Sequence, residues 1–191
     1  MTEKEFCNAL KNLNSSRESR LKHAQIVKND MSLFPYLIAM IFKVDDKISY
    51  HAAWVLEFVC ADNIDVIIPH LDTFTENIHR VHFDSAIRPI SKICVFMANA
   101  YFSKEDNKLK KFLLPKHSER IVETCFDWLI NKHKVAPKVF AMETLFILGH
   151  ESSWIHNDLK QILEQDFTKQ SAAFKSRAKH ILIRLKKISK A

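Results

Sequence analysis

Glycine occurs only once in this chain of 191 residues, at Gly149. Phosphate-cradling loops, dinucleotide-binding turns and most tight hairpins need glycine, because the backbone there takes positive φ angles or approaches a ligand closely. All-β folds and nucleotide-loop enzymes are therefore disfavoured. The hydrophobic content of 47% and the charged content of 27% are those of a globular chain, and the length fits one domain, 1–191.

Apolar residues recur at steps of three and four almost everywhere along the chain, which is the spacing of one face of an α-helix. The clearest such stripe lies among lysines and arginines of the C-terminal segment and consists of Phe174, Ala178, Ile181, Leu185 and Ile188. At the other end, Thr2 and Glu5 have the spacing of a helix capping box. The expected fold class is all-α.

A repeated pairing of leucine and alanine runs through the helical pattern. The leucines are Leu37, Leu71, Leu129 and Leu163, and 12 or 15 residues after each comes an alanine four positions before a large aliphatic residue. The pairs of alanine and aliphatic residue are Ala52/Leu56, Ala86/Ile90, Ala141/Leu145 and Ala178/Leu182. Leucines 37 and 71 are 34 residues apart, as are leucines 129 and 163. A small residue one turn before a large one favours closely packed helices.

This pattern resembles HEAT and armadillo repeats, in which helix pairs bury their apolar faces only on their neighbours. The resemblance covers residues 32–188 and implies an α-solenoid of about four helix pairs, with 1–30 as N-terminal cap helices. A surplus of 24 residues falls around the charged segment 101–118, which is predicted to be an insertion or loop. Two features depart from the family: Pro89 lies inside a predicted helix, and there is no regular ladder of aspartate and arginine.

The basic charge of the chain is concentrated at its C-terminal end. Of the net charge of +7, residues 169–191 carry +8 and the remainder carries −1. A helix of this kind can face phosphates or an acidic partner. Alternatively, it is a solvated face whose cations suit the negative end of the helix dipole.

The first residues mix acidic and basic side chains, so they do not have the pattern of a secretory signal, and a cytoplasmic protein is expected. The longest uncharged runs, 31–42 and 93–103, are shorter than a membrane span. We therefore expect no membrane partner. The cysteines lack paired spacing, which predicts reduced thiols that lie mostly in the core: Cys7, Cys60, Cys94 and Cys125.

In helical-repeat proteins the second helices usually line a concave surface. Positions one before, two after and six after each alanine point away from its buried side. The ligand-binding groove predicted from them comprises His51, Trp54, Phe58, Arg88, Lys92, Glu143, Arg177, His180 and Arg184, with Ser85, Phe140 and Ile147 on the same face. Alternatively, the aromatic and aliphatic members belong to the core of helices covered on both sides.

Two stretches that contain histidine are candidate sites. The first stretch offers zinc-type ligands, namely Glu76, His79, His82 and Asp84. It has no second histidine pair and no His-Glu-x-x-His motif, so we expect a polar loop there and no metal or cofactor. The second, around His150 and His156, is predicted to be a turn, with a helix ending at Gly149 and another capped by Ser152 or Ser153.

No catalytic residue is predicted, because the available cysteine and histidine pairs, His51 with Cys60 and His82 with Cys94, follow no motif. The chain distantly resembles the HEAT-like DNA alkylation-repair glycosylases, which use aromatic residues with an aspartate. In this chain no tryptophan is followed one helical turn later by an aspartate, so their activity is not implied. Short all-helical chains are also described as adenylosuccinate lyases, whose serine- and glycine-rich catalytic loop has no counterpart here.

The function expected is therefore a non-catalytic binding or scaffolding module that uses the concave face, with a protein or acidic peptide as partner. The alternative is a nucleic-acid-binding protein. An enzyme, such as the lyase just named, is the third possibility and has no motif in its support.

Overall fold

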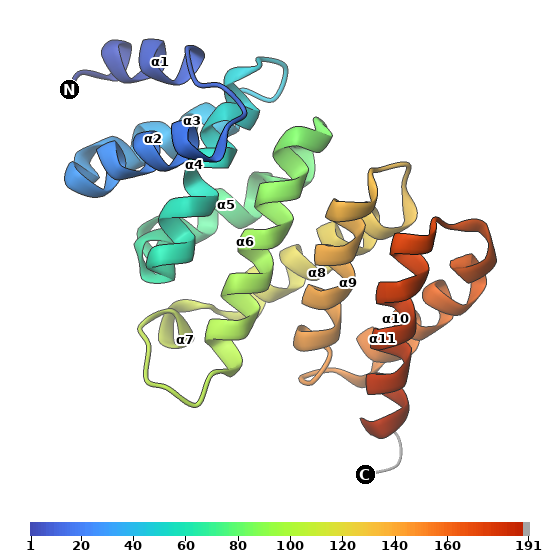
Figure 1. Cartoon of the computed structure of the whole chain (residues 1–191). Helices are drawn as coiled ribbons and strands as arrows, with labels where there is room; N and C mark the ends of the chain where they lie inside the picture. Colours follow the sequence, from blue (N-terminus) through green and yellow to red (C-terminus); the bar gives the residue numbers. More distant parts are fainter. Residues whose placement is uncertain (189–191) are drawn as a thin grey trace.

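The structure, a computed structural model, describes residues 1–188, and within this range the chain is all-α with no strand (Figure 1). The helices are α1 (Glu3–Lys11), α2 (Arg17–Asn29), α3 (Phe34–Ile41), α4 (Ile48–Asp62), α5 (Leu71–Asn77), α6 (Asp84–Phe102), α7 (Leu109–Phe112), α8 (Pro115–Ile130), α9 (Val135–Leu148), α10 (Ser153–Asp166) and α11 (Ala172–Ile188). Short 3-10 helices lie at Met31–Leu33, Ile64–His70, Ile78–Arg80 and Phe167–Lys169. The expected all-α class is confirmed.

Five helices form a row in which each packs against the next: α2, α4, α6, α9 and α11. The other long helices cover this row, since α3 packs on α4, α8 on α9, and α10 on both α9 and α11. In Figure 1 the row crosses the molecule from the blue N-terminal helices to the red C-terminal helix. The candidate site lies on three helices of this row, α2, α4 and α6.

The leucine and alanine repeat marks the core. All four leucines and all four alanines are buried, and so are the aliphatic residues Leu56, Ile90 and Leu145. Leu182 is only partly buried. Its helix, α11, is the last of the row in the described part of the chain, so it packs on one neighbouring row helix instead of two.

Two local predictions concern the ends of the chain: the capping box at the N-terminus and the apolar stripe of the C-terminal helix. The capping box is present, because the Thr2 hydroxyl accepts a bond from the Glu5 amide (3.3 Å) and the Glu5 carboxylate accepts one from the Thr2 amide (2.8 Å). In α11 the predicted apolar stripe is buried except at Ile188, which is 39% exposed, so the stripe ends one turn earlier than predicted. The last part of the basic segment, 189–191, lies outside the described residues.

Gly149 ends α9, as predicted, and its φ of −62° is right-handed. The need for glycine comes from space instead: a Cβ at this position would collide with the His156 ring. That ring is held by a bond between its Nε2 and the Phe146 carbonyl oxygen (2.8 Å). Helix α10 begins after Ser152, which makes no side-chain capping bond. The single glycine therefore allows α10 to turn closely onto the end of α9.

The charged segment 101–118 is only partly a loop. It contains the end of α6, the short helix α7 and the start of α8. Leu109 and Leu113 are buried, and the Leu109 amide donates to Asp65 Oδ1 (3.0 Å). The two leucines thus anchor the segment in the core. Their burial was not predicted, because the residues around them are mostly charged.

All four cysteines are free thiols, and three of them, Cys60, Cys94 and Cys125, are buried as expected, while Cys7 is half-buried. Burial raises the pKa of the Cys60 thiol well above its ordinary value, so this group stays protonated and unreactive. Across residues 1–188, no helix combines the length and the apolarity needed to cross a lipid bilayer.

Candidate binding face

Trp54 of α4 is fixed by a bond to the next helix of the row. Its indole Nε1 donates to the Ser85 carbonyl oxygen of α6 at 2.8 Å. That carbonyl lacks its usual partner, because the residue four positions later is Pro89, which has no N–H to donate. Proline inside α6 therefore explains where the tryptophan is held: the indole supplies the hydrogen bond that the helix cannot make.

Glu57, one turn after Trp54, is buried and holds two cations of α6. Its side chain is 5% exposed, with Oε1 2.7 Å from Lys92 Nζ and Oε2 3.3 Å from Arg88 Nη1. Arg88 and Lys92 themselves remain partly exposed. A buried carboxylate attracts cations more strongly than one in water does. Glu57 therefore fixes the position of both cations at the surface.

Cationic side chains also lie over the aromatic rings of this region. The Arg20 guanidinium carbon of α2 is 4.2 Å from the centre of the Trp54 ring. Arg17 lies 5.8 Å from the Phe58 ring, and Lys92 lies 5.4 Å from Phe96. Such contacts are favourable because the negative face of the ring attracts the cation. We name this group the basic cluster; it consists of Arg17, Arg20, Trp54, Glu57, Phe58, Arg88, Lys92 and Phe96.

Arg20 is the member whose bonding is least complete. Its Nε is buried and has no hydrogen-bond partner within the described chain. Burial lowers the pKa of Arg20, the nearby Arg88 lowers it further, and Glu57 partly offsets both. The buried Nε is out of reach of a ligand, but the terminal nitrogens of this partly exposed side chain can donate to an anion, and such charge-assisted bonds are strong.

A groove of about 620 Å³ lies beside the basic cluster and shares Arg17 and Phe58 with it. Leu21 and Lys22 of α2 contribute to the same wall. Leu21 is 39% exposed. The groove therefore offers apolar and basic groups side by side, and its volume is within the range of ligand sites.

The structure brings together four of the predicted groove residues in this cluster: Trp54, Phe58, Arg88 and Lys92. His51 lies beside them, with its ring centre 5.3 Å from that of Trp54, and within the described residues its buried Nδ1 has no hydrogen-bond partner. Burial lowers the pKa of His51. Its ring thus packs against that of Trp54 at the edge of the cluster.

The remaining predicted residues lie at the other end of the row. Arg184 of α11 pairs with Glu143 of α9 (2.7 Å) and lies 3.7 Å from the centre of the Phe146 ring. Arg177 and His180 of α11 are exposed. On the same predicted face, Phe140 is half-buried, and Ile147 is buried and belongs to the core. This end of the predicted groove is therefore a second region with its own ion pair.

Sequence reasoning missed Arg17, Arg20 and Phe96, and it did not give Glu57 its role. The signal for the arginines was present, because Arg17 and Arg20 are three residues apart and share a face of one helix. The sequence pattern predicts a cap for residues 1–30, and this prediction does not indicate which residues lie on the outward face of the helix. Only the packing of α2 on α4 places these cations over the aromatic rings.

The histidine-containing stretch around α5 and α6 does not converge on one point. Glu76 pairs with Arg120 (2.8 Å), Asp84 with His133 (3.1 Å), and His82 lies near Asp45 (3.7 Å). Each side chain therefore has a different neighbour. In the part of the chain that the structure describes, no group of three or more histidine, cysteine, aspartate or glutamate residues could hold a metal ion.

Comparison of the chain with protein families, with curated proteins and with solved structures finds no match.

Proposed function

We propose that the chain is a non-catalytic binding module of HEAT-like helix pairs, and that its basic cluster binds an acidic segment of a partner protein. The solenoid arrangement is supported by the row of five helices and by the buried leucine and alanine repeat. The observation that carries the function is Arg20, whose guanidinium lies over the Trp54 ring near the cations Arg88 and Lys92. A carboxylate could pair with the terminal nitrogens of these side chains.

An acidic polypeptide suits this region better than a bare anion does. The groove beside the cluster presents Leu21 and Phe58 next to Arg17 and Lys22, so it can accept an apolar side chain flanked by carboxylates. The Trp54 ring carries Arg20 on one face and is tied to α6 through its indole nitrogen. These contacts stabilise a fixed surface, which lowers the entropic cost of binding.

A nucleic acid is the second candidate, and a different region favours it. Helix α11 exposes Arg177, Lys179 and Lys187, and it belongs to the segment that carries a charge of +8. A phosphate backbone bound by several such cations releases counterions, so its affinity falls steeply as the salt concentration rises. An amphipathic peptide should be less sensitive to salt, because apolar contacts contribute to its binding.

Fluorescence anisotropy can test the proposal with two probes: a labelled peptide that alternates aspartate with leucine, and a labelled single-stranded oligonucleotide. The matched variants are Arg20→Ala in the cluster and Arg80→Ala outside it, where the side chain is exposed and bonds only to Asn77 within the described residues. We expect Arg20→Ala to weaken peptide binding about tenfold, as loss of a well-placed charge contact does. Arg80→Ala should leave binding unchanged.

The proposal fails if the peptide does not bind at ~50 mM salt, or if the two arginine variants behave alike. Circular dichroism should first establish that Arg20→Ala folds, and Arg20→Lys retains the charge if it does not. Tight oligonucleotide binding that collapses between ~50 and ~200 mM salt, in the absence of peptide binding, would replace the first candidate with the second.

A further inference from the structure

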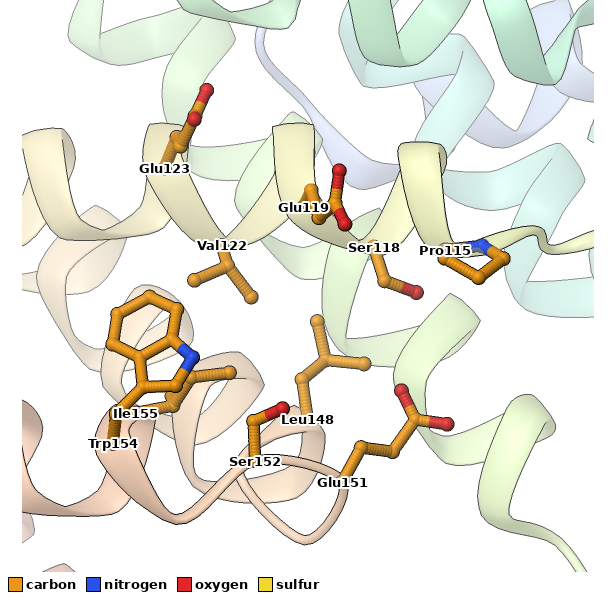
Figure 2. Close-up of a pocket in the computed structure, with 10 residues that line it drawn as sticks. All are labelled: Pro115, Ser118, Glu119, Val122, Glu123, Leu148, Glu151, Ser152, Trp154 and Ile155. Carbon is orange, nitrogen blue, oxygen red and sulfur yellow. The ribbon is translucent and has the colours of Figure 1, made fainter.

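A pocket of about 280 Å³ lies between α8 and the turn that joins α9 to α10 (Figure 2). It is separate from the basic cluster, since none of its lining residues belongs to α2, α4 or α6. Sites for drug-sized ligands occupy roughly 300 to 1,000 Å³. This pocket lies just below that range, so it has room for one long side chain. We name it the acidic pocket, after Glu119 and Glu151, which line it.

The floor of the acidic pocket is apolar. It is formed by Val122 of α8, Leu148 at the end of α9 and Ile155 of α10. Figure 2 shows Val122 and Leu148 pointing toward each other from opposite sides of the pocket. Lysine and arginine side chains carry an apolar stem below a charged head, so such a floor fits the stem of either residue.

Within the described residues, the carboxylates at the edge of the pocket are not paired with a cation. Within residues 1–188, neither Glu119 nor Glu151 forms an ion pair with a basic side chain. Glu151 is held in place because Tyr101 donates its hydroxyl hydrogen to Oε1 (2.6 Å), a bond that raises the pKa of Tyr101. The second carboxylate oxygen of Glu151 and both oxygens of Glu119 therefore remain as acceptors for a cation.

Trp154 forms one side of the acidic pocket and is 53% exposed. Its ring stacks on Phe126, with the centres 5.9 Å apart and an interplanar angle of 26°. That contact fixes the orientation of the indole. The indole can therefore present an aromatic surface to a cation beside the two carboxylates.

A hydroxyl that has no protein partner within the described residues provides an independent sign of a polar ligand. Ser118 lines the pocket, is only 9% exposed and, in the described part of the chain, makes no side-chain hydrogen bond. Figure 2 shows its oxygen directed away from the α8 backbone, on the side where Glu151 lies. Because the residue is nearly buried while its oxygen opens on the pocket, Ser118 is suited to meet the head group of a ligand, for which its hydroxyl can accept a hydrogen bond.

We propose that the acidic pocket binds one lysine or arginine side chain of a partner polypeptide. The stem would lie on the apolar floor, and the charged head would meet Glu119, Glu151 and the Ser118 hydroxyl beside the Trp154 ring. Hydrogen bonds of this kind between a cation and a carboxylate are stronger than neutral ones. This inference goes beyond the function proposed above, because it assigns a second site, of opposite charge, to a different part of the molecule.

The test follows the three tryptophan indole signals by two-dimensional NMR while amino-acid amides are added, with Trp154→Phe used to assign the signal. The probes are N-acetyl-arginine amide, N-acetyl-lysine amide and N-acetyl-norleucine amide, which has the stem without the charge. Single side chains should bind with dissociation constants on the order of millimolar. We expect the arginine or lysine probe to shift the Trp154 signal and the norleucine probe to leave it unchanged.

Glu119 and Glu3 provide a matched pair of variants, since both are exposed glutamates on helices and only Glu119 lines the pocket. Glu119→Gln should weaken binding about fivefold, the upper range for an exposed ion pair, while Glu3→Gln should change it little. Equal shifts with norleucine, equal effects of the two variants, or no shift of the Trp154 signal would each overturn the proposal. A guanidinium ion that binds as well as the arginine probe would show that the stem is not recognised, which would also overturn it.

Discussion

The basic cluster and the acidic pocket both combine charged side chains with an aromatic ring, but they differ in whether these charges have partners of opposite sign inside the protein. In the basic cluster, one buried carboxylate, Glu57, holds Arg88 and Lys92, and Arg20 rests on Trp54. In the acidic pocket, Glu119 has no opposite charge beside it within the described residues. A buried charge must be compensated inside the protein, whereas an exposed one can be solvated until a ligand arrives. The first region should therefore matter for both stability and binding, and the second mainly for binding.

The largest effect on the free energy of unfolding is expected when Glu57, the carboxylate that holds the basic cluster together, loses its charge. Glu57→Gln leaves two cations without their carboxylate, and breaking a buried pair in this way should cost about 2 to 3 kcal/mol. Arg88 and Lys92 can still reach water, which keeps the cost at the lower end. Urea denaturation measures the change in the free energy of unfolding.

Glu119→Gln is the matched control, because it makes the same chemical change at an exposed position. Its effect on the free energy of unfolding should stay within about 0.5 kcal/mol. If the two variants were destabilised equally, the contrast between a structural and a free carboxylate would not hold.

A smaller effect is expected at the turn that closes the acidic pocket. In Gly149→Ala, the new Cβ would collide with His156, which is held by the Phe146 carbonyl oxygen. Overpacking of this kind should reduce the free energy of unfolding by about 2 kcal/mol. The turn carries Glu151, so the same variant should weaken binding of the arginine amide while leaving peptide binding at the basic cluster unchanged. Weakening at both sites would show that the two regions are coupled.

The bond between Trp54 and α6 can be isolated with a double-mutant cycle. Trp54→Phe removes the indole donor from the Ser85 carbonyl and should cost about 1 kcal/mol more in the parent than in the Pro89→Ala background. In that background, the alanine N–H can bond to the same carbonyl. Thermal unfolding of the four proteins measures the coupling. Additive effects would mean that the indole bond does not compensate for the proline.

The smallest effect is expected at Asp72, an exposed carboxylate that, unlike Glu119, has cations beside it. Bonds from Lys116 and His117 lower the pKa of Asp72 to about 2. Because the folded-state pKa is below the unfolded one, the stabilisation is present above about pH 4 and is lost as the pH falls toward 2. The melting temperatures of the parent and Asp72→Asn should therefore converge over this interval. A constant difference would show that the ion pairs do not contribute. Asp158→Asn, at an exposed aspartate that forms no ion pair within the described residues, provides the control.

Much of the helical framework could be predicted because it depends on local spacing. The capping box at Thr2, the end of α9 at Gly149 and the burial of Leu37 and Ala52 all follow from residues near one another in the chain. Ile188 was assigned to the buried stripe, but it lies at the last described turn of α11 and is exposed. Periodicity predicts which side of a helix is apolar, but not how far the neighbouring helices extend along it.

The sequence by itself determined that the chain is all-α, which residues of each helix are apolar, and that one end is strongly basic. Tertiary structure alone decided which charges meet. Arg20 lies 34 residues before Trp54, and Glu57 lies 35 residues before Lys92, so their contacts depend on how α2, α4 and α6 pack together. The same is true of Ser118 and Trp154, which share a pocket because α8 and α10 both pack on α9. Hydrophobic patterning specifies elements through short-range spacing, whereas charge pairs and pockets form only where separate elements come into contact.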